Sequence, residues 1–592
     1  MVAKTKFCTS NKCTLLVLIV VAVTIAVCCV IIFADKNIRK IRQYDPSNLE
    51  WWKTSVIYQI YPRSFMDSGD DGIGDLKGIT QKLDYFTYLG VGAIWISPFY
   101  KSPMRDFGYD VQNYTEVDKN FGTMTDFDEL MKEAKKRDIK VILDFVPNHT
   151  SNESEWFQKS RKLDKKYKDY YVWAEGKDVP NNWISVFGGS AWTWDGLRQQ
   201  YYYHAFLDSQ PDLNYRNPQV LQELKSVLKF WLDKGVAGFR VDAFKFAYEA
   251  KNQSLNEETP RLDKNNKTVY RDDDPHKYTT NLPELYDVIK DWRKLFDEYK
   301  EKDKISRFMS TESYGLSNEM RNEYYKAGSI PFNFDLITKL DKKCDGTCFK
   351  EIIEGALKDL PNDAWPNFVM GNHDQPRVAK RMGKGMIDVM NMLLLTLPGT
   401  PTCYYGDEIG MDNVFYPFKE TQDPYGLNYG EEEYQKYSRD PERSPMQWDS
   451  SLPNAGFSKG KPWLRVNEIH HENNVETERT AKTKTNLHVF KTVLGIRKQP
   501  SFQNKDITFS VVNENFLSFV RTAEGRPKYL VVLNVSPTDN STITGDFSQE
   551  PVGSSKGEVV ASTGTLDVAY GAIVKLNEIR LKRGQGLIVK VL

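Results

Sequence analysis

Apolar runs typical of β-strands recur along the chain and alternate with helical patterns. Residues 126–138 have a helical pattern, and so do residues 218–235, which begin with proline and end with glycine. Strands that alternate with helices predict an α/β fold with a parallel sheet, and eight such units predict a closed (β/α)8 barrel. The eight runs lie at 54–62, 93–100, 140–149, 235–243, 307–313, 329–335, 366–374 and 400–408.

Two intervals between these runs are too long for simple crossovers. Residues 150–215 are rich in Trp, Tyr, Gly and Asn, which predicts a small domain inserted after the third strand, and residues 244–306 predict an exposed excursion with one helix. Short alternating strands from 500 to 592 predict a separate β-sandwich domain. The barrel itself is then expected to comprise residues 51–149 and 216–495.

The N-terminal region contains an uncharged apolar segment, residues 14–33, which is long enough to cross the hydrocarbon layer. We predict a single-pass type II anchor with a cytoplasmic tail at 1–13 and a linker at 34–50. A cleaved signal peptide is the alternative, although its apolar region should be shorter. Basic residues flank both ends of the segment, so they do not decide the orientation. An outside body and a cell-membrane location are favoured by glycosylation sequons at Asn113, Asn152, Asn252, Asn266, Asn534 and Asn540.

Composition is that of an ordinary globular protein, with 592 residues, 40% hydrophobic and 27% charged. Lys and Arg together number 80, as do Asp and Glu, so no net field attracts nucleic acid. Among seven cysteines, Cys344 and Cys348 flank a short turn and predict a disulfide in an oxidising compartment. Zinc is the alternative, but no second pair of ligands lies nearby in the sequence.

Acidic residues close several of the apolar runs. Asp242, Glu312 and Asp374 end the runs GFRVDA, FMSTES and GNHD, while Asn148 and His149 end DFVPNH. Barrels of this kind hold their catalytic groups at the carboxyl ends of the strands, so these acids are expected to converge. A convergent carboxylate cluster is the chemistry of glycosidic bonds. Each acid alone has the surface salt bridge as its ordinary alternative.

With QPDLN at 210–214, RSPMQWD at 443–449 and NAGFS at 454–458, these motifs resemble glycoside hydrolase family 13, in its α-glucosidase branch. The resemblance covers about residues 50–592. It implies a TIM barrel, an inserted domain after the third strand, a C-terminal β domain, retaining cleavage of α-glucosidic bonds, and no organic cofactor. The expected activity is exo-acting hydrolysis of maltose, malto-oligosaccharides or sucrose outside the cell.

The resemblance also assigns roles to the site residues. Asp242 matches the nucleophile, Glu312 the acid/base and Asp374 the group that stabilises the transition state. Asp144 is expected only to support its neighbours. The residues expected to bind the sugar or to orient the acids are Asp106, Tyr109, His149, Arg240, His373 and Arg377. In this branch, alanine after the nucleophile accompanies α-1,4 preference, and Ala243 stands there.

The loop from Asp67 to Asp75 carries acids around glycines, an arrangement that suits oxygen ligation of calcium. It matches the family's calcium site, with expected ligands Asp67, Asp71, Ile73 and Asp75. Gly69 replaces the usual asparagine ligand. A metal-free polar turn is the alternative.

A second class of protein shares this fold and membrane topology: the chain also resembles the heavy chains of heteromeric amino-acid transporters. These chains accompany a membrane-embedded light subunit and need not catalyse. Phe244 and Lys245 resemble that class, because insect-type maltases usually carry Val-Pro there. The expected bridging cysteine outside the membrane is missing, however, and the catalytic acids are all present, so the hydrolase is the favoured interpretation. A non-catalytic sugar-binding or receptor role is a third hypothesis.

Overall fold

The computed structural model describes residues 49–592 except 258–260, 263–267, 271–273, 275, 313 and 539. The predicted membrane anchor and the Asn266 sequon lie outside the described residues. Within the described part of the chain, no helix combines the length and the apolar character needed to cross a bilayer.

A parallel barrel forms the centre of the molecule. Six strands pair in the order β12-β9-β5-β2-β1-β13. Two of the eight predicted runs form single bridges instead of strands: Asn333 pairs with Phe368, and Val369 pairs with Thr402. Ile330 and Phe332 donate backbone hydrogen bonds to β12, and together with these bridges they connect β12 to β13 and close the barrel, as predicted. The strands are β1 (Ile57–Ile60), β2 (Ala93–Ile96), β5 (Lys140–Phe145), β9 (Gly238–Val241), β12 (Phe308–Thr311) and β13 (Thr402–Tyr404).

Local sequence explains the helices around the barrel. Thr123 and Asp126 form a capping box at the start of α6 (Met124–Lys136). Asn217 caps α8 (Pro218–Asp233), and Gly235 adopts a positive φ of 91° just beyond its end. Their apolar faces pack on the strands. Further barrel helices are α4 (Leu76–Gln81), α5 (Leu83–Leu89), α9 (Leu285–Asp303), α10 (Asn318–Lys326), α12 (Gly346–Leu357), α14 (Ile387–Thr396) and α17 (Asn486–Arg497).

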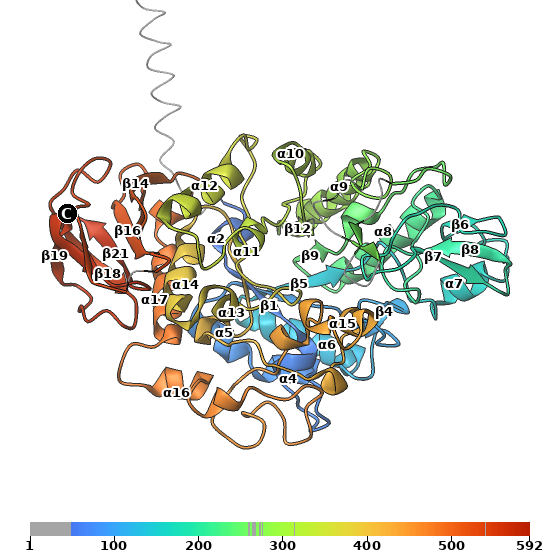
Figure 1. Cartoon of the computed structure of the whole chain (residues 1–592), viewed down its shortest axis with the longest axis horizontal. Helices are drawn as coiled ribbons and strands as arrows, with labels where there is room; N and C mark the ends of the chain where they lie inside the picture. The colour runs from blue at the N-terminus through green and yellow to red at the C-terminus, as the bar shows by residue number, and fades with distance from the viewer. Residues whose placement is uncertain are drawn as a thin grey trace, which may run out of the picture.

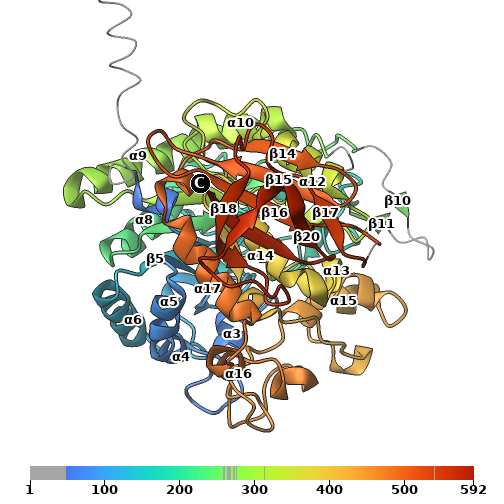
Figure 2. The ribbon, with the colours of Figure 1, turned by 90° about the vertical axis from the view of Figure 1, so that its left-hand side faces the viewer.

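The inserted and C-terminal domains lie at opposite ends of the barrel (Figure 1). The inserted domain follows β5 and holds α7 (Glu155–Ser160) and an antiparallel sheet of β6 (Trp173–Ala174), β8 (Gln200–Tyr203) and β7 (Trp192–Asp195). The C-terminal domain is all-β, as predicted; it faces the viewer in Figure 2 and packs against the barrel helices α12, α14 and α17. Its main sheet is β14 (Thr508–Val512), β15 (Phe516–Arg521), β16 (Tyr529–Asn534), β21 (Gly586–Val591), β18 (Lys556–Ser562) and β19 (Ile573–Lys575), with β17 (Ile543–Gly545) pairing β20 (Ile579–Leu581).

The excursion after β9 is less exposed than predicted. Phe244, Lys245 and Phe246 form a buried 3-10 turn directly behind the strand end. The excursion then continues through β10 (Arg261–Leu262) and β11 (Thr268–Val269). The prediction was wrong here because hydrophilic composition does not show which few residues of a long loop fold back onto the barrel.

The covalent features have separate outcomes. Cys344 and Cys348 form the predicted disulfide just before and within the first turn of α12, with Cα atoms 5.2 Å apart. The Asn534 sequon is a correction: the side chain has no exposed surface, and its Nδ2 donates to the Leu581 carbonyl at 3.0 Å. A glycan has no room there, whereas Asn113, Asn252 and Asn540 are exposed and Asn152 is partly exposed.

Candidate active site

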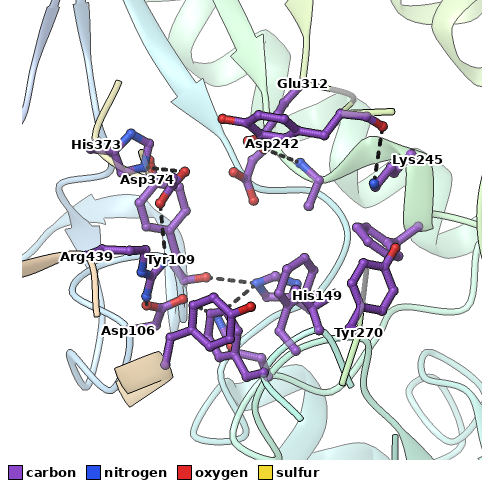
Figure 3. Close-up of a pocket in the computed structure, with 18 of the residues that line it drawn as sticks. Asp106, Tyr109, His149, Asp242, Lys245, Tyr270, Glu312, His373, Asp374 and Arg439 are labelled. Carbon is purple, nitrogen blue, oxygen red and sulfur yellow. Dashed lines mark hydrogen bonds and ion pairs between the residues drawn. The ribbon is translucent and has the colours of Figure 1, made fainter. Parts of the chain in front are cut away.

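The predicted acids meet in one cavity at the carboxyl ends of the barrel strands. Asp242 directly follows β9, and Glu312 follows β12. The cavity has a volume of about 420 Å³. Charged groups gather at one side of it, and Lys245 and Tyr270 lie at the other (Figure 3). It is lined by Asp106, Tyr109, His149, Val186, Phe187, Phe206, Gln210, Asp242, Ala243, Lys245, Phe246, Tyr270, Glu312, Tyr314, His373, Asp374, Gln375, Tyr425 and Arg439.

Arg240 organises three carboxyl groups from beneath this cavity. Its side chain is only 2% exposed, and its guanidinium is 2.8 Å from both Asp144 Oδ1 and Glu312 Oε2. It also contacts Asp242 Oδ1. Arg240 does not line the cavity, so of the two predicted roles its contacts support orienting the acids. It lies on β9, two residues before Asp242, and points to the same side of the strand.

Asp242 and Glu312 form a closely coupled pair. Burial raises the pKa of Asp242 well above its ordinary value; Arg240 opposes this, while the Glu312 carboxylate adds to it. The two side chains also hydrogen-bond to each other. Both carboxyl groups also contact the Arg240 guanidinium, so the site holds the two acids side by side on one buried cation.

The charged wall is built around Asp374. Its Oδ1 lies 2.9 Å from Arg443 Nη2 and 3.3 Å from Arg439 Nη1. Burial acts to raise the pKa of Asp374, but the neighbouring His373, Arg439 and Arg443 outweigh it and hold the pKa below its usual range. Arg439 also contacts Asp106 Oδ1 at 2.8 Å. Asp374 thus stays ionised throughout the working pH range and suits charge stabilisation rather than proton transfer.

Neutral rings complete the same wall. His373 stacks on Tyr109 with ring centroids 5.3 Å apart and planes 7° from parallel. The Tyr109 hydroxyl donates to Asp144 Oδ2 at 3.1 Å. Burial lowers the pKa of His149 to about 4 and that of His373 further below its ordinary value. Both imidazoles are therefore uncharged at neutral pH and suited to hydrogen-bonding sugar hydroxyls.

Arg377 is the site prediction that the structure corrects. Its side chain is fully buried away from the cavity lining, and Nη1 donates to the Tyr405 carbonyl at 2.7 Å. It also lies 3.7 Å from Asp407. The chain turns after Asp374 to start α13 (Val378–Met382), which carries Arg377 toward the end of β13. Arg439 and Arg443 take the orienting role that was expected of Arg377.

Several lining residues were missed. Arg439 lies shortly before the RSPMQWD motif at 443–449, and this position could have marked it as a candidate. Gln210 opens the QPDLN motif and lies 3.3 Å from Asp106 Oδ2. Most of the aromatic residues come from irregular segments, while Phe246 lies in a 3-10 turn and Tyr425 in the short helix Pro424–Tyr429, so no periodic sequence pattern marked them. They are Phe187, Phe206, Phe246, Tyr270, Tyr314 and Tyr425.

The predicted calcium loop does not present a ready ligand set. Asp67 Oδ1 accepts backbone N–H groups of Gly69 and Asp70, and Oδ2 accepts from Gly72 and the Ser458 hydroxyl. Asp75 caps α4 through Gly78 N. Asp71 accepts from Ile73 N at 2.9 Å. Within the residues described, no group of three or more His, Cys, Asp or Glu side chains could hold a metal ion. We therefore derive no step through calcium.

A buried carboxylate cluster at the strand ends of a (β/α)8 barrel defines a glycoside hydrolase architecture. A family model for the alpha-amylase catalytic domain matches residues 59–505. The chain is 44% identical to Maltase 1 of Drosophila virilis over 521 residues, or 85% of this chain and 81% of that protein. It is 38% identical to the amino acid transporter heavy chain SLC3A1 of Homo sapiens over 92% of this chain and 78% of that one.

Solved structures agree with these sequence relatives. The alpha-glucosyl transfer enzyme XgtA superposes with a TM-score of 0.80 at 34% identity, over 92% of this chain and all of that chain. The trehalulose synthase MutB from Pseudomonas mesoacidophila MX-45 superposes with a TM-score of 0.77 at 32% identity, over the same shares of the two chains. The chain belongs to the alpha-amylase family, glycoside hydrolase family 13, and the expected family is confirmed.

Proposed function

We propose that this protein is a retaining α-glucosidase that removes terminal glucose from maltose, malto-oligosaccharides or sucrose. The observation that carries the proposal is the pair of carboxyl groups, Asp242 and Glu312, held at the strand ends on one buried guanidinium. The relatives at 40 to 44% identity that are named maltase or alpha-glucosidase support it.

The reaction follows from the two carboxyl groups. Asp242, as carboxylate, attacks the anomeric carbon while Glu312 donates its proton to the leaving oxygen, which breaks the glycosidic bond. Glu312 then takes a proton from water, and the water oxygen displaces Asp242 from the sugar. Asp374 stabilises the positive charge that develops on the ring. The terminal glucose, which was bound to Asp242, is released with its anomeric configuration retained.

The groups that line the cavity beside Asp374 support exo-action. The Asp106–Arg439 pair lies there, and Phe187 stacks on Tyr425 with ring centroids 4.7 Å apart. We expect these groups to hold the terminal glucose, which favours cleavage at the end of a sugar chain. Ala243 lines the cavity directly after the nucleophile, which supports the α-1,4 preference.

Replacing Asp242 tests the assignment. We expect the purified full chain to release glucose from maltose and sucrose, and Asp242→Asn to abolish release without changing the thermal midpoint by more than a few degrees. Asp128→Asn, at an exposed acid paired with Lys234, is the matched control and should keep full activity. Equal turnover by Asp242→Asn and the parent would reject the nucleophile.

Two further expectations rest on sequence alone. We propose that residues 14–33 anchor the body outside the cell, because they are uncharged and the sequons require a glycosylating compartment. Extraction by detergent but not by carbonate would test this. Calcium at the Asp67–Asp75 loop stays a prediction; an unchanged thermal midpoint in chelator would argue against it.

The transporter heavy chain is the second candidate, favoured by the 38% identity to SLC3A1. Phe244 and Lys245 are the sequence feature that supports it, and both are buried beside the nucleophile. A membrane subunit that co-purifies with the full chain and transports amino acids would support this role. In that case Asp242→Asn should leave transport unchanged.

A further inference from the structure

Asp423 lies behind the charged wall and reaches two parts of the site. It has no exposed surface. It begins α15 (Pro424–Tyr429), and its Oδ1 accepts the backbone N–H of Tyr425. Tyr425 is the residue that stacks on Phe187, and both rings line the cavity. The same carboxylate therefore anchors the helix that carries this aromatic cover.

The stronger contacts of Asp423 are with Arg439. Arg439 Nη2 lies 2.6 Å from Asp423 Oδ1, and Arg439 Nε lies 3.1 Å from both carboxylate oxygens. The backbone N–H of Arg439 donates to Asp423 Oδ2 at 2.7 Å. This paired geometry is the most directional that a guanidinium and a carboxylate form. It holds one edge of the guanidinium and turns its remaining donors toward Asp106 and Asp374.

The segment that carries Asp423 is held in return. Asp440 Oδ2 accepts the backbone N–H groups of Gln422 at 2.6 Å and Asp423 at 3.1 Å. Arg439 and Asp440 are neighbours in the sequence. The Arg439 side chain contacts the Asp423 carboxylate, and the Asp440 side chain accepts the backbone N–H groups of residues 422–423. The Arg439 guanidinium also lies 5.1 Å from the Phe187 ring centroid, beneath the aromatic cover. These contacts fix the guanidinium before any sugar arrives.

We propose that Asp423 is a positioning residue that presents Arg439 to Asp106, to Asp374 and to the hydroxyls of the bound terminal glucose. The inference rests on the proposed function, since it concerns the sugar that the site would cleave. Fixing an arginine side chain costs conformational entropy. Because Asp423 already fixes Arg439 in the free protein, that entropy loss does not reduce the affinity for the sugar. Without its carboxylate, Arg439 should move onto Asp106 or Asp374 and no longer serve both.

The test compares variants that keep the helix cap but lose the charge. Asparagine and serine both cap helices well, so Asp423→Asn and Asp423→Ser retain the start of α15. Asp345→Asn, at the cap of α12 away from the cavity, is the matched control. Glucose binding by calorimetry and the KM and kcat for maltose would be measured for each purified full chain across pH 4 to 8.

We expect Asp423→Asn and Asp423→Ser to weaken glucose binding and raise the KM by roughly tenfold or more, the usual range for a lost charged hydrogen bond. The acid limb of kcat/KM should also move to higher pH, because a loosened Arg439 no longer lowers the pKa of Asp374. A helix cap alone would not move this limb. Asp345→Asn should match the parent in both measurements.

Three outcomes would overturn the proposal. The first is parental glucose affinity and an unmoved acid limb in both variants. The second is that neither cap-retaining variant folds, because Asp423 would then serve folding. The third is a parent protein that does not bind glucose. If the parent binds glucose but does not hydrolyse maltose, only the proposed function fails, because calorimetry still reports on Arg439.

Discussion

Replacing Arg240 should reveal how much of the site depends on one buried cation. Arg240→Met keeps most of the side-chain volume but removes the partner of Asp144, Asp242 and Glu312. Removing one member of a buried ionic group typically costs about 3–5 kcal/mol, because the remaining charges are left without compensation. For a body of this size, that corresponds to roughly 3–5 °C in the thermal midpoint.

The loss should depend on pH in a definite direction. Burial already raises the pKa of Asp144 to about 6 against the opposing pull of Arg240. Without Arg240, the folded-state pKa values of Asp144 and Asp242, which burial already raises, rise further above their unfolded values. Such groups favour folding below the unfolded pKa and lose that contribution as pH rises through the folded pKa. Arg240→Met should therefore be strongly destabilised at pH 8 and nearly as stable as the parent at pH 4.5.

Thermal unfolding of the parent and the variant at pH 4.5, 6 and 8 measures this directly. Arg240→Lys is the matched control: it keeps the positive charge but cannot contact three carboxyls at once, so it should fall between the two. Maltose turnover should drop by roughly 10²–10³-fold in Arg240→Met. A deficit in thermal midpoint that is the same at pH 4.5 and pH 8 would refute the electrostatic argument.

Two further predictions concern sites away from the cavity. Burial raises the pKa of Glu408 to about 7, and its carboxylate accepts hydrogen bonds from the hydroxyls of Tyr58 and Tyr85 at 2.7 Å. Because this folded-state pKa lies above the unfolded value, Glu408 favours folding at low pH, and that contribution is lost as pH rises through 7. Glu408→Gln should therefore gain up to about 3 kcal/mol relative to the parent at pH 8 and nothing at pH 4.5, measured by urea unfolding; a gain at both pH values would contradict this. Glycopeptide mass spectrometry should find Asn534 unmodified, since it is buried, while Asn113→Gln should remove one glycan from the intact mass; a glycan on Asn534 would contradict the fold of β16.

The predictions that succeeded depend on strands. Asp242 and Glu312 follow apolar runs whose ends must lie at one rim of a closed barrel, so their convergence follows from topology. The helical patterns at 126–138 and 218–235 likewise predicted the bounds of α6 and α8 to within two residues at each end. Regular elements repeat a local pattern, and local patterns are what a single sequence displays.

The predictions that failed concern loops and buried neighbours. Arg377 stands three residues after Asp374, but the start of α13 sends its side chain to Tyr405 instead. Arg439 lies 65 residues after Asp374 and still contacts it. No periodicity links such positions, because each contact depends on how a whole loop folds back. Sequence reasoning therefore found the three acids and four further residues that line the cavity, Asp106, Tyr109, His149 and His373, and missed Arg439, Gln210 and the aromatic lining.

The cost of the Arg240 cluster bears on the choice between a hydrolase and a transporter subunit. Burying a guanidinium with three carboxyls is expensive, and replacing such a group with apolar side chains of similar volume is often neutral or stabilising. A chain that needed the barrel only as a scaffold would gain nothing in stability from Arg240, Asp242 and Glu312. Their arrangement makes physical sense where two adjacent acids take part in bond cleavage, and that requirement is turnover.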